Sequence, residues 1–252
     1  EVVFSTAMVG YPESLTDPSY SGQILCVTYP LIGNYGVPDE GIDQYGISKN
    51  FESEKIWVRG LVISEYSFKY SHWDAVKSLD EWMKEQKIPG IYGVDTREIT
   101  KMLRDNGSML GQIIPEGEVA EEEVHDPNTD NQIDIVSCKE VIRYGSGDKK
   151  VVLVDCGVKH NILRCFVDRG VELIRVPWTM ISCRWITTDF SFPTVRATLS
   201  SARRLWTISA RRWNRTSRFS VSAWVTISWQ ELPARLLINS NMDIEAITSR
   251  SA

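Results

Sequence analysis

Apolar runs separated by turn-forming clusters predict a β-rich α/β segment over residues 1–115. Runs rich in β-branched and aromatic residues are typical of strands, and the Gly, Pro, Asp and Ser clusters between them favour turns. A glycine-rich loop with Gly33, Gly36, Gly41 and Gly46 follows the second run. The predicted strands are residues 1–9, 23–29, 56–63, 90–94 and 109–114.

Two stretches carry the spacing of apolar residues that is typical of a helix with one buried face. The first follows residues 71–74, Ser-His-Trp-Asp, which can cap a helix at its N-terminus. The residues predicted to share the buried face of this helix are Val76, Leu79, Trp82 and Met83.

The second helix is predicted to begin after Asp95, because an aspartate side chain can accept hydrogen bonds from the free amides of the first turn. Glu98 lies at the third helical position, and Gly107 supplies the stop. The residues predicted to be buried on this helix are Ile99, Met102 and Leu103.

The next part of the chain predicts a parallel α/β unit. The acidic run 116–123 is interpreted as a solvated surface or linker. Residues 151–155, Val-Val-Leu-Val-Asp, form a continuous apolar run, as expected for a strand buried on both faces. A short helix over 161–168 and a strand over 171–176 complete a right-handed βαβ unit. Two strands do not make a stable sheet, so further strands are expected.

Length and composition are those of a soluble globular protein with one or two domains. The chain has 252 residues, of which 42% are hydrophobic and 24% are charged. No apolar run is long enough for a transmembrane helix, and the first residues lack the pattern of a signal peptide. The missing initiator Met indicates that the natural start lies upstream. The net charge of -5 gives no reason to expect nucleic-acid binding.

The cysteines favour a reducing, cytoplasmic location. Five cysteines, an odd number without a close pair, argue against a disulfide framework or a zinc site. They are Cys26, Cys138, Cys156, Cys165 and Cys183.

The composition changes abruptly after Trp178. Residues 1–178 hold 18 Lys and Arg against 29 Asp and Glu, whereas residues 179–252 hold 10 against 4. All ten cations of the last 74 residues are Arg, five of the nine Trp lie there, and Gly and Tyr are absent. A folded domain of that length without Gly would lack the residue best suited to turns with positive φ.

Two positions have both a catalytic or binding interpretation and a structural one. Cys156 and His160 lie four residues apart at a strand-to-helix junction and could form a catalytic pair, although no third group nearby would orient the base. The alternative is a strand-end cysteine followed by a helix-capping histidine. Ser19 lies in a Pro-preceded turn and could bond its own backbone. A phosphate loop and an HExxH motif are both absent.

Three stretches resemble the small subunit of glutamine-hydrolysing carbamoyl phosphate synthase. Residues 1–38 (EVVFSTAMVGYPESLTDPSYSGQILCVTYPLIGNYGVP) resemble its start, and residues 93–107 (GVDTREITKMLRDNG) resemble a later helix entrance. Residues 151–178 (VVLVDCGVKHNILRCFVDRGVELIRVPW) resemble the opening of its class I glutamine amidotransferase domain. Cys156 departs from the family, which commonly has Phe there.

The resemblance implies a glutaminase subunit that passes ammonia to a large subunit. It implies that Ser19 contacts the substrate glutamine, and that this chain needs no cofactor or metal of its own. ATP and Mg²⁺ would be used by the large subunit, which is the expected partner, and neither nucleic acid nor a membrane is expected as one. The resemblance leaves open whether the enzyme serves arginine or pyrimidine synthesis.

The family's catalytic residues are missing from the chain as translated. No GICLG turn with the nucleophilic Cys follows Trp178, and no His follows His160, so no catalytic residue is assigned. Reading residues 179–252 one base out of register permits DYDF directly after Trp178, then DGLFLSNGPGD, IFGICLGNHLLARAAG and YGHRSHNQ in family order. A frameshift just after Trp178 explains both the missing motifs and the change in composition.

These observations predict an α/β protein in three parts. Residues 1–145 form the small-subunit N-terminal domain, residues 151–178 the opening strand–helix–strand of the amidotransferase domain, and residues 179–252 an irregular out-of-frame tail. The chain is expected to be an inactive piece of a glutaminase subunit. Two alternatives are a docking module for the large subunit without chemistry, and a polyanion-binding Arg/Trp-rich tail.

Overall fold

The computed structural model describes residues 1–180, 189–193 and 219–222, the last two ranges by their backbone alone. The chain divides into two compact units, and each is described by itself. The first is Glu1–Gln132 with Lys159–Asn161, and the second holds Ile133–Val158 and the described residues from Ile162 onward. Within the described residues, no helix has the length and apolar character needed to cross a membrane.

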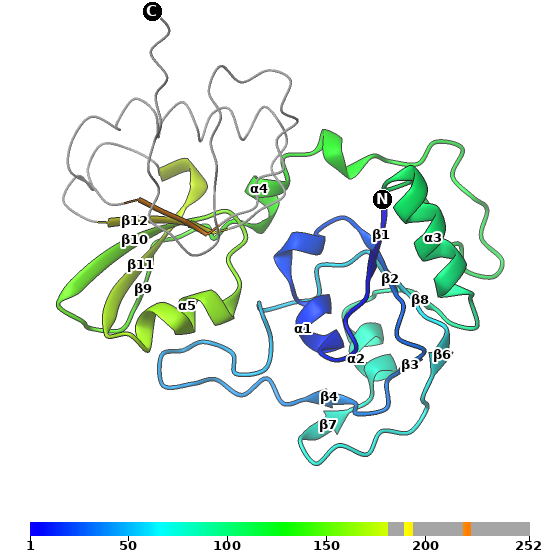
Figure 1. Ribbon diagram of the computed structural model, residues 1–252, viewed down its shortest axis with the longest axis horizontal. Helices are drawn as coiled ribbons and strands as arrows, with labels where there is room; N and C mark the ends of the chain where they lie inside the picture. The colour runs from blue at the N-terminus through cyan, green and yellow to red at the C-terminus, as the bar shows by residue number, and fades with distance from the viewer. Residues whose placement is uncertain (181–188, 194–218, 223–252) are drawn as a thin grey trace, which may run out of the picture. The chain divides into compact units, whose positions relative to one another are not determined.

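A sheet of four parallel strands, in the order β1-β2-β5-β8, lies at the centre of the first unit (Figure 1). Two small sheets pair β3 with β6 in parallel and β4 with β7 antiparallel. The strands are β1 Val2–Ser5, β2 Ile24–Val27, β3 Leu31–Ile32, β4 Val37–Pro38, β5 Gly60–Val62, β6 Glu65–Tyr66, β7 Ala75–Lys77 and β8 Gly90–Ile91. The helices are α1 Tyr11–Leu15, η1 Pro18–Tyr20, α2 Leu79–Glu85, α3 Thr96–Asn106 and η2 Pro127–Thr129.

Strand β2 supplies the core on both faces of this sheet. Leu25 and Val27 pack into a cluster that contains residues of α1 and α2, whereas Ile24 and Cys26 pack into a second cluster with Ile99 of α3. Alternate side chains of a strand point to opposite faces, so the two clusters mark two covered faces. The predicted strand 23–29 is confirmed in its central four residues.

The ends of α3 are as the sequence predicts, but its buried face is narrower. The Asp95 side chain accepts hydrogen bonds from the amides of Arg97 (3.1 Å) and Glu98 (3.0 Å), and Gly107 ends the helix at φ 83°. Leu103 is buried. Met102 is 50% exposed, so its predicted burial is wrong.

The helix predicted after residues 71–74 begins later, at Leu79. Residues before it form β7, which pairs with β4, and Val76 is exposed. Ser78 caps α2 instead, and its hydroxyl and amide exchange hydrogen bonds with Glu81 as a capping box. Leu79, Trp82 and Met83 are buried as predicted.

Residues 109–114 do not form the predicted strand. One isolated bridge joins Met109 to Val2, and the Val2 amide donates to the Met109 carbonyl over 2.6 Å. Ile113 is part of the apolar cluster on the α3 face of the sheet. This apolar run is therefore accounted for by packing onto the sheet rather than by pairing with it.

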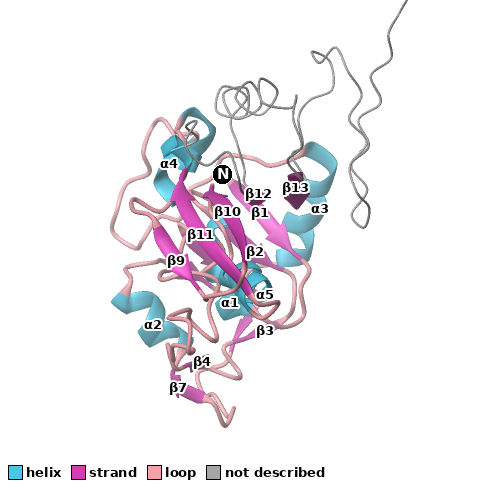
Figure 2. Ribbon diagram, turned by 90° about the vertical axis from the view of Figure 1, so that its left-hand side faces the viewer, coloured by secondary structure: helices cyan, strands magenta, loops and turns pink. Residues whose placement is uncertain are grey.

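Strands β10 and β11 pair in parallel at the centre of the second unit, with Val151 opposite Leu173, which confirms the predicted parallel pairing. Figure 2 shows β9, β11 and β10 side by side, and the full order is β13-β12-β10-β11-β9, with β9 antiparallel. The strands are β9 Ile142–Tyr144, β10 Lys149–Asp155, β11 Val171–Pro177, β12 Asp189–Pro193 and β13 Phe219–Ser222. The helices are α4 Gln132–Val136, α5 His160–Val167 and η3 Trp178–Met180.

The compact units and the predicted domains divide the chain at different places. The first compact unit ends at Gln132, whereas the predicted first domain runs to residue 145 and includes β9, which pairs with β11 of the second unit. Strands β12 and β13 lie within the tail that is expected to be irregular or poorly packed, and they extend the parallel sheet next to β10. Phe190 and Phe192 in β12, like Phe219 and Val221 in β13, follow the alternation that favours a strand. The rest of the predicted tail, from residue 181 onward, lies outside the described residues.

A buried ion pair between Asp155 and Arg175 lies at the carboxyl end of β10. The Asp155 carboxylate, which has no exposed surface, accepts from Arg175 Nε (2.8 Å) and lies 2.7 Å from Arg175 Nη2. It also accepts from the amides of Cys138 (2.6 Å), Gly157 (2.9 Å) and Val158 (2.9 Å). One carboxylate therefore ties β10, β11 and two turns together.

Replacing Asp155 with Ala is expected to destabilise the second unit by about 3–5 kcal/mol, because Arg175 would keep a buried charge without its carboxylate partner. Urea unfolding monitored by circular dichroism measures the loss, and Asp168→Ala, at an exposed aspartate, is the matched control. A loss of less than 1 kcal/mol for Asp155→Ala, no larger than that of the control, contradicts the assigned role.

Candidate functional site

Ser19 lies in the single 3₁₀ turn η1, and Asp17 shapes this turn. The Asp17 side chain caps η1 by accepting from the Ser19 amide over 2.9 Å, and Pro18 occupies the first turn position, where its missing amide costs nothing. The Tyr20 amide donates to the Asp17 carbonyl (3.1 Å), and the Ser21 amide donates to the Pro18 carbonyl (3.1 Å). The local sequence Asp-Pro-Ser-Tyr thus satisfies its own backbone.

The Ser19 hydroxyl is not used by the turn. Within the described part of the chain no hydrogen bond of the Ser19 hydroxyl is found, and the side chain is half-buried. Bonding of this hydroxyl to its own backbone, the structural alternative for this serine, is therefore absent from this geometry. A half-buried hydroxyl beside a fixed turn can donate to or accept from a polar ligand.

Lys159 places a positive charge beside this turn, within the first unit. Its Nζ lies 2.6 Å from the buried Asp17 Oδ2, while Asp17 Oδ1 holds the Ser19 amide. Burial lowers the pKa of Lys159, but the charge and hydrogen bond of Asp17 outweigh burial and raise the pKa overall. Burial, followed by the Asp17 charge, raises the pKa of the neighbouring Tyr20.

A second loop holds the chain next to η1 in place. Thr16 Oγ1 donates to the Pro12 carbonyl (2.8 Å) and accepts from the Glu52 amide (3.0 Å). The Ser53 hydroxyl donates to the Thr16 carbonyl over 2.5 Å. The turn that carries Ser19 is therefore braced from both sides, which suits a residue that positions a ligand.

Cys156 does not have the properties of a catalytic thiol. It is buried among Val152, Val154 and Ile174 in the second unit. Burial, followed by the charge of Asp155, raises its pKa to about 12, so the thiol stays protonated at neutral pH. An activated cysteine needs the opposite shift. The structural reading of Cys156 as a strand-end cysteine fits these observations.

His160 contacts the Glu52 backbone and the Glu54 carboxylate within the first unit. Its amide donates to the Glu52 carbonyl (2.9 Å), and its Nε2 lies 3.3 Å from Glu54 Oε1. Its buried Nδ1 has no hydrogen-bond partner in the described residues. His160 begins α5, which agrees with its interpretation as a residue of the helix start rather than as a base for Cys156.

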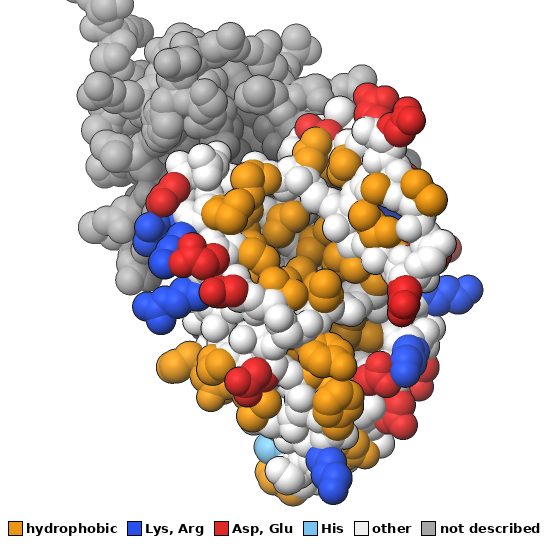
Figure 3. Space-filling view, turned by 90° about the vertical axis from the view of Figure 1, so that its right-hand side faces the viewer, with side chains coloured by type: hydrophobic (Ala, Val, Ile, Leu, Met, Phe, Trp, Pro, Cys, Tyr) orange, Lys and Arg blue, Asp and Glu red, His pale blue; other side chains and the backbone are white. Residues whose placement is uncertain are grey.

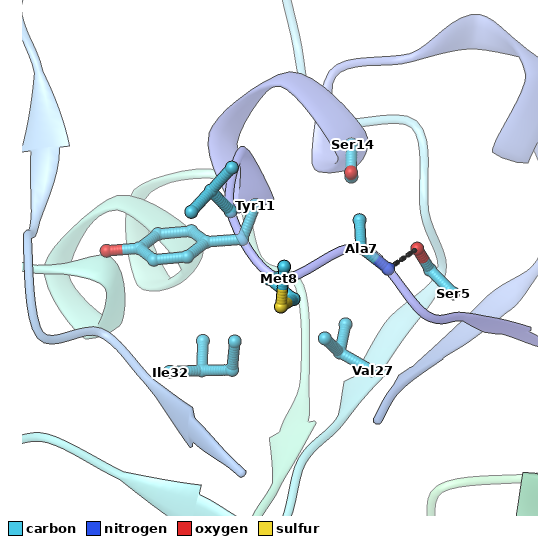
Figure 4. Close-up of a pocket in the computed structure, with 8 residues that line it drawn as sticks. Ser5, Ala7, Met8, Tyr11, Ser14, Val27 and Ile32 are labelled. Carbon is cyan, nitrogen blue, oxygen red and sulfur yellow. Dashed lines mark hydrogen bonds between the residues drawn. The ribbon is translucent and has the colours of Figure 1, made fainter. Parts of the chain in front are cut away.

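The described residues offer no metal cluster, and Ser19 does not line the pocket drawn in Figure 4. No group of three or more His, Cys, Asp or Glu is arranged for a metal ion in that part of the chain. Figure 4 shows a shallow hollow around Tyr11, Met8, Val27 and Ile32, with the Ala7 amide donating to Ser5 Oγ. It is small and lined mainly by apolar groups, so it does not resemble a site for a polar substrate.

Sequence reasoning missed Asp17 and Lys159. The Asp17 cap had a local signal, because Asp two residues before Ser and directly before Pro favours this kind of turn. The contact with Lys159 had none, because it joins positions far apart in the chain.

The geometry defines an α/β protein with parallel sheets and a braced polar turn at Ser19. Residues 1–113 match the family model described as carbamoyl-phosphate synthase small chain, CPSase domain. The human protein named carbamoyl-phosphate synthase (ammonia), mitochondrial, is 52% identical over 180 residues, which cover 71% of this chain and 12% of the human protein. The carbamoyl phosphate synthase arginine-specific small chain of Eremothecium gossypii is 48% identical over 188 residues, which cover 73% of this chain and 47% of that small chain.

Larger proteins contain the same region. The multifunctional protein pyr1-3 of Dictyostelium discoideum is 47% identical over 192 residues, which cover 71% of this chain and 9% of that protein. The matched part of the chain is thus homologous to the small chain of carbamoyl-phosphate synthase and to the corresponding region of longer proteins. The chain spans less than half the length of each of these curated relatives.

Cys156 is expected to react with iodoacetamide at least a hundredfold more slowly than Cys165 in the folded protein. Cys165 is exposed, whereas Cys156 is buried and its pKa is raised to about 12. Mass spectrometry of timed labelling at pH 7.5 gives both rates, and labelling in urea is the control in which the difference should disappear. Equal native rates would be inconsistent with a buried, inert Cys156.

Asp17 variants separate the cap from the ion pair. Asp17→Ala removes both and is expected to cost about 1–2 kcal/mol of stability, whereas Asp17→Asn keeps an acceptor for the Ser19 amide and costs less. The raised pKa of Lys159 means that its ionic contribution is full below its unfolded pKa and is lost as pH rises through its folded pKa.

Urea unfolding at pH 7.5 and at several values above pH 10 measures both effects. The cost of Asp17→Asn should shrink as pH rises through the folded pKa of Lys159, and Lys159→Met should show the same pH dependence. Equal costs for Asp17→Ala and Asp17→Asn at pH 7.5 would rule out a capping contribution.

Proposed function

We propose that this chain is a piece of the glutaminase subunit of carbamoyl phosphate synthase, the subunit that releases ammonia from glutamine for a large ATP-using subunit. The extent of the similarity carries this proposal. Residues 1–178 make up 71% of the chain, and the human relative is similar over the same share. The similarity thus has the length of the part that precedes the change in composition.

Ser19 is the residue proposed to contact glutamine. Its free hydroxyl and the braced turn support this role, since the amide of a glutamine side chain both donates and accepts hydrogen bonds. Ser19 has no base beside it in the described residues: Asp17 is occupied by the turn amide and Lys159. Ser19 therefore binds but does not activate the substrate.

The chain as translated is proposed to be inactive, because a single-base frameshift after Trp178 removed the catalytic residues. Amide hydrolysis by this class of enzyme needs a thiolate beside a base and an oxyanion hole. In the offset reading the nucleophile's codon spans Ser222 and Ala223, so the translated chain has no thiol there. Cys156 is a poor substitute, because its thiol is buried and protonated.

The large subunit is the proposed partner, and it would hold ATP and Mg²⁺, whereas this chain would hold neither. The name "small chain" of the Eremothecium gossypii relative supports a larger companion. A cytoplasmic location is proposed from the cysteine usage alone.

A docking module without chemistry is the second candidate. The human relative is named for ammonia, yet it is as similar to this chain as the small chains are. Similarity over this region is therefore compatible with a protein that takes ammonia directly. On this reading the folded units bind the large subunit and contribute no glutaminase activity.

Restoring one G after Trp178, and extending the gene to its natural end, is expected to bring back glutamine hydrolysis. The expected gain is many orders of magnitude, since a nucleophile and its base act as a unit. Ammonia release from glutamine by the chain as translated and by the repaired chain, each with the large subunit, measures it. A repaired chain with the nucleophilic Cys changed to Ser is the control.

Two outcomes are decisive. Equal, substantial activity before and after repair contradicts the frameshift. A repaired chain without activity, but still bound to the large subunit, favours the docking module instead.

A further inference from the structure

Four exposed aromatic side chains and the half-buried Tyr66 lie on the first unit and are here called the aromatic surface: Tyr66, Phe68, Tyr70, Trp73 and Tyr92. Trp73 is 88% exposed, Phe68 71% and Tyr92 58%. Figure 3 shows hydrophobic side chains gathered in the middle of one view, with acidic and basic side chains around them. Exposed apolar groups of this kind are uncommon on proteins that have no partner.

The rings of the aromatic surface are ordered against one another. Phe68 meets Tyr66 edge to face at 4.9 Å between centroids and meets Tyr92 edge to face at 5.9 Å. The Tyr66 hydroxyl accepts a hydrogen bond from the Asp80 amide at the start of α2 over 3.2 Å. These contacts hold rings from β6, the loop after it and the segment after β8 in one arrangement.

The turn that contains Gly33 and Gly36 lies beneath two of these rings. The Gly36 amide donates to the Gly33 carbonyl over 3.1 Å, and both glycines have positive φ. A Cβ on Gly33 would lie 2.7 Å from the Tyr66 ring, and a Cβ on Gly36 would lie 2.9 Å from the Tyr70 ring. Both rings therefore pack directly on backbone that only glycine leaves free.

Trp73 is connected to the same turn through the neighbouring ring of His72. Tyr35, inside the glycine turn, meets His72 at 6.3 Å, and His72 meets Trp73 at 5.3 Å. Trp73 itself contributes almost nothing to the core, since most of its surface faces solvent. An exposed Trp that is held through His72 and Tyr35 has the composition of a binding hot spot, in which Trp and Tyr are enriched.

We propose that the aromatic surface docks onto the large polypeptide of carbamoyl phosphate synthase. This inference rests on the proposed function and adds to it the residues of this chain that make the contact. The occupant follows from how the relatives are built. The region belongs to a separate small chain in Eremothecium gossypii, but forms 12% of one long human chain and 9% of a Dictyostelium discoideum chain. A region that occurs both alone and fused is expected to contact the remainder in each case.

The test is a binding titration with the full chain. The probe is the purified large chain that accompanies the Eremothecium gossypii arginine-specific small chain, and that small chain is the positive control. Trp73→Ala and Phe68→Ala are each expected to weaken binding at least tenfold, as is typical of exposed aromatic anchors that become buried. Val119→Ala, at a residue that is 92% exposed and outside the aromatic surface, is expected to change the affinity less than twofold.

Each outcome decides something different. If the wild-type chain binds and all variants bind with the same affinity, the proposed docking role of the aromatic surface is wrong, while the proposed function is unaffected. Failure of the wild-type chain to bind, while the positive control binds, defeats the proposed function and this inference with it. Self-association that Trp73→Ala abolishes in sedimentation, with the large chain still bound, identifies a second copy as the occupant and overturns the proposal. Circular dichroism of each variant must match the wild type, which the exposure of Trp73 and Phe68 favours.

Discussion

The second unit depends on one buried carboxylate. Asp155 ends β10 and holds Arg175 of β11 together with three backbone amides from two turns. A buried charge is costly unless it is paired and hydrogen-bonded, so this pair discriminates strongly between registers. A shift of β11 by one residue would turn Arg175 toward the apolar cluster on the other face of the sheet. The apolar strands account for most of the buried surface, whereas the ion pair favours one register of these strands over the others.

Sequence analysis predicts an element correctly where the local sequence and the burial of that segment in the fold favour the same structure. Residues 151–155 form a strand because a continuous apolar run suits a parallel sheet covered on both faces, and Asp95 caps α3 with its own side chain. The start of α2 could not be chosen locally, since residues 71–74 and residues 78–81 both offer Ser followed three positions later by an acid. Pairing of β7 with β4 decides between them, and that contact joins distant parts of the sequence. The strand predicted over residues 109–114 is wrong for a similar reason. Apolar character alone does not distinguish a segment that packs on a sheet from a strand that pairs with it.

The candidate site was less predictable than the fold. Ser19 came from a family resemblance, and only the structure separates its hydroxyl from the turn's own hydrogen bonds. The aromatic surface was hidden because pattern analysis assigns apolar residues to the interior. The sequence pattern assigns Trp73 to a helix cap, whereas the structure packs Tyr66 and Tyr70 onto the turn of Gly33 and Gly36 and leaves Trp73 exposed. Exposure of an aromatic residue is a tertiary property, so sequence spacing carries no signal for it.

Strands β12 and β13 are compatible with a frameshift, although they lie in the segment proposed to be out of frame. In the offset reading, the middle base of each codon is the first base of an in-frame codon. Phe codons begin with T, as do most Ser codons, and every codon with T in the middle encodes an apolar residue. The offset reading therefore permits Gly-Leu-Phe-Leu over β12 and Ile-Phe-Gly-Ile over β13, while the translated residues alternate Phe or Val with Ser. Both readings favour extended backbone at these two places, one as fully apolar strands and one as alternating strands. Such short strands can add to the edge of an established sheet without the catalytic residues that would follow them in the other frame.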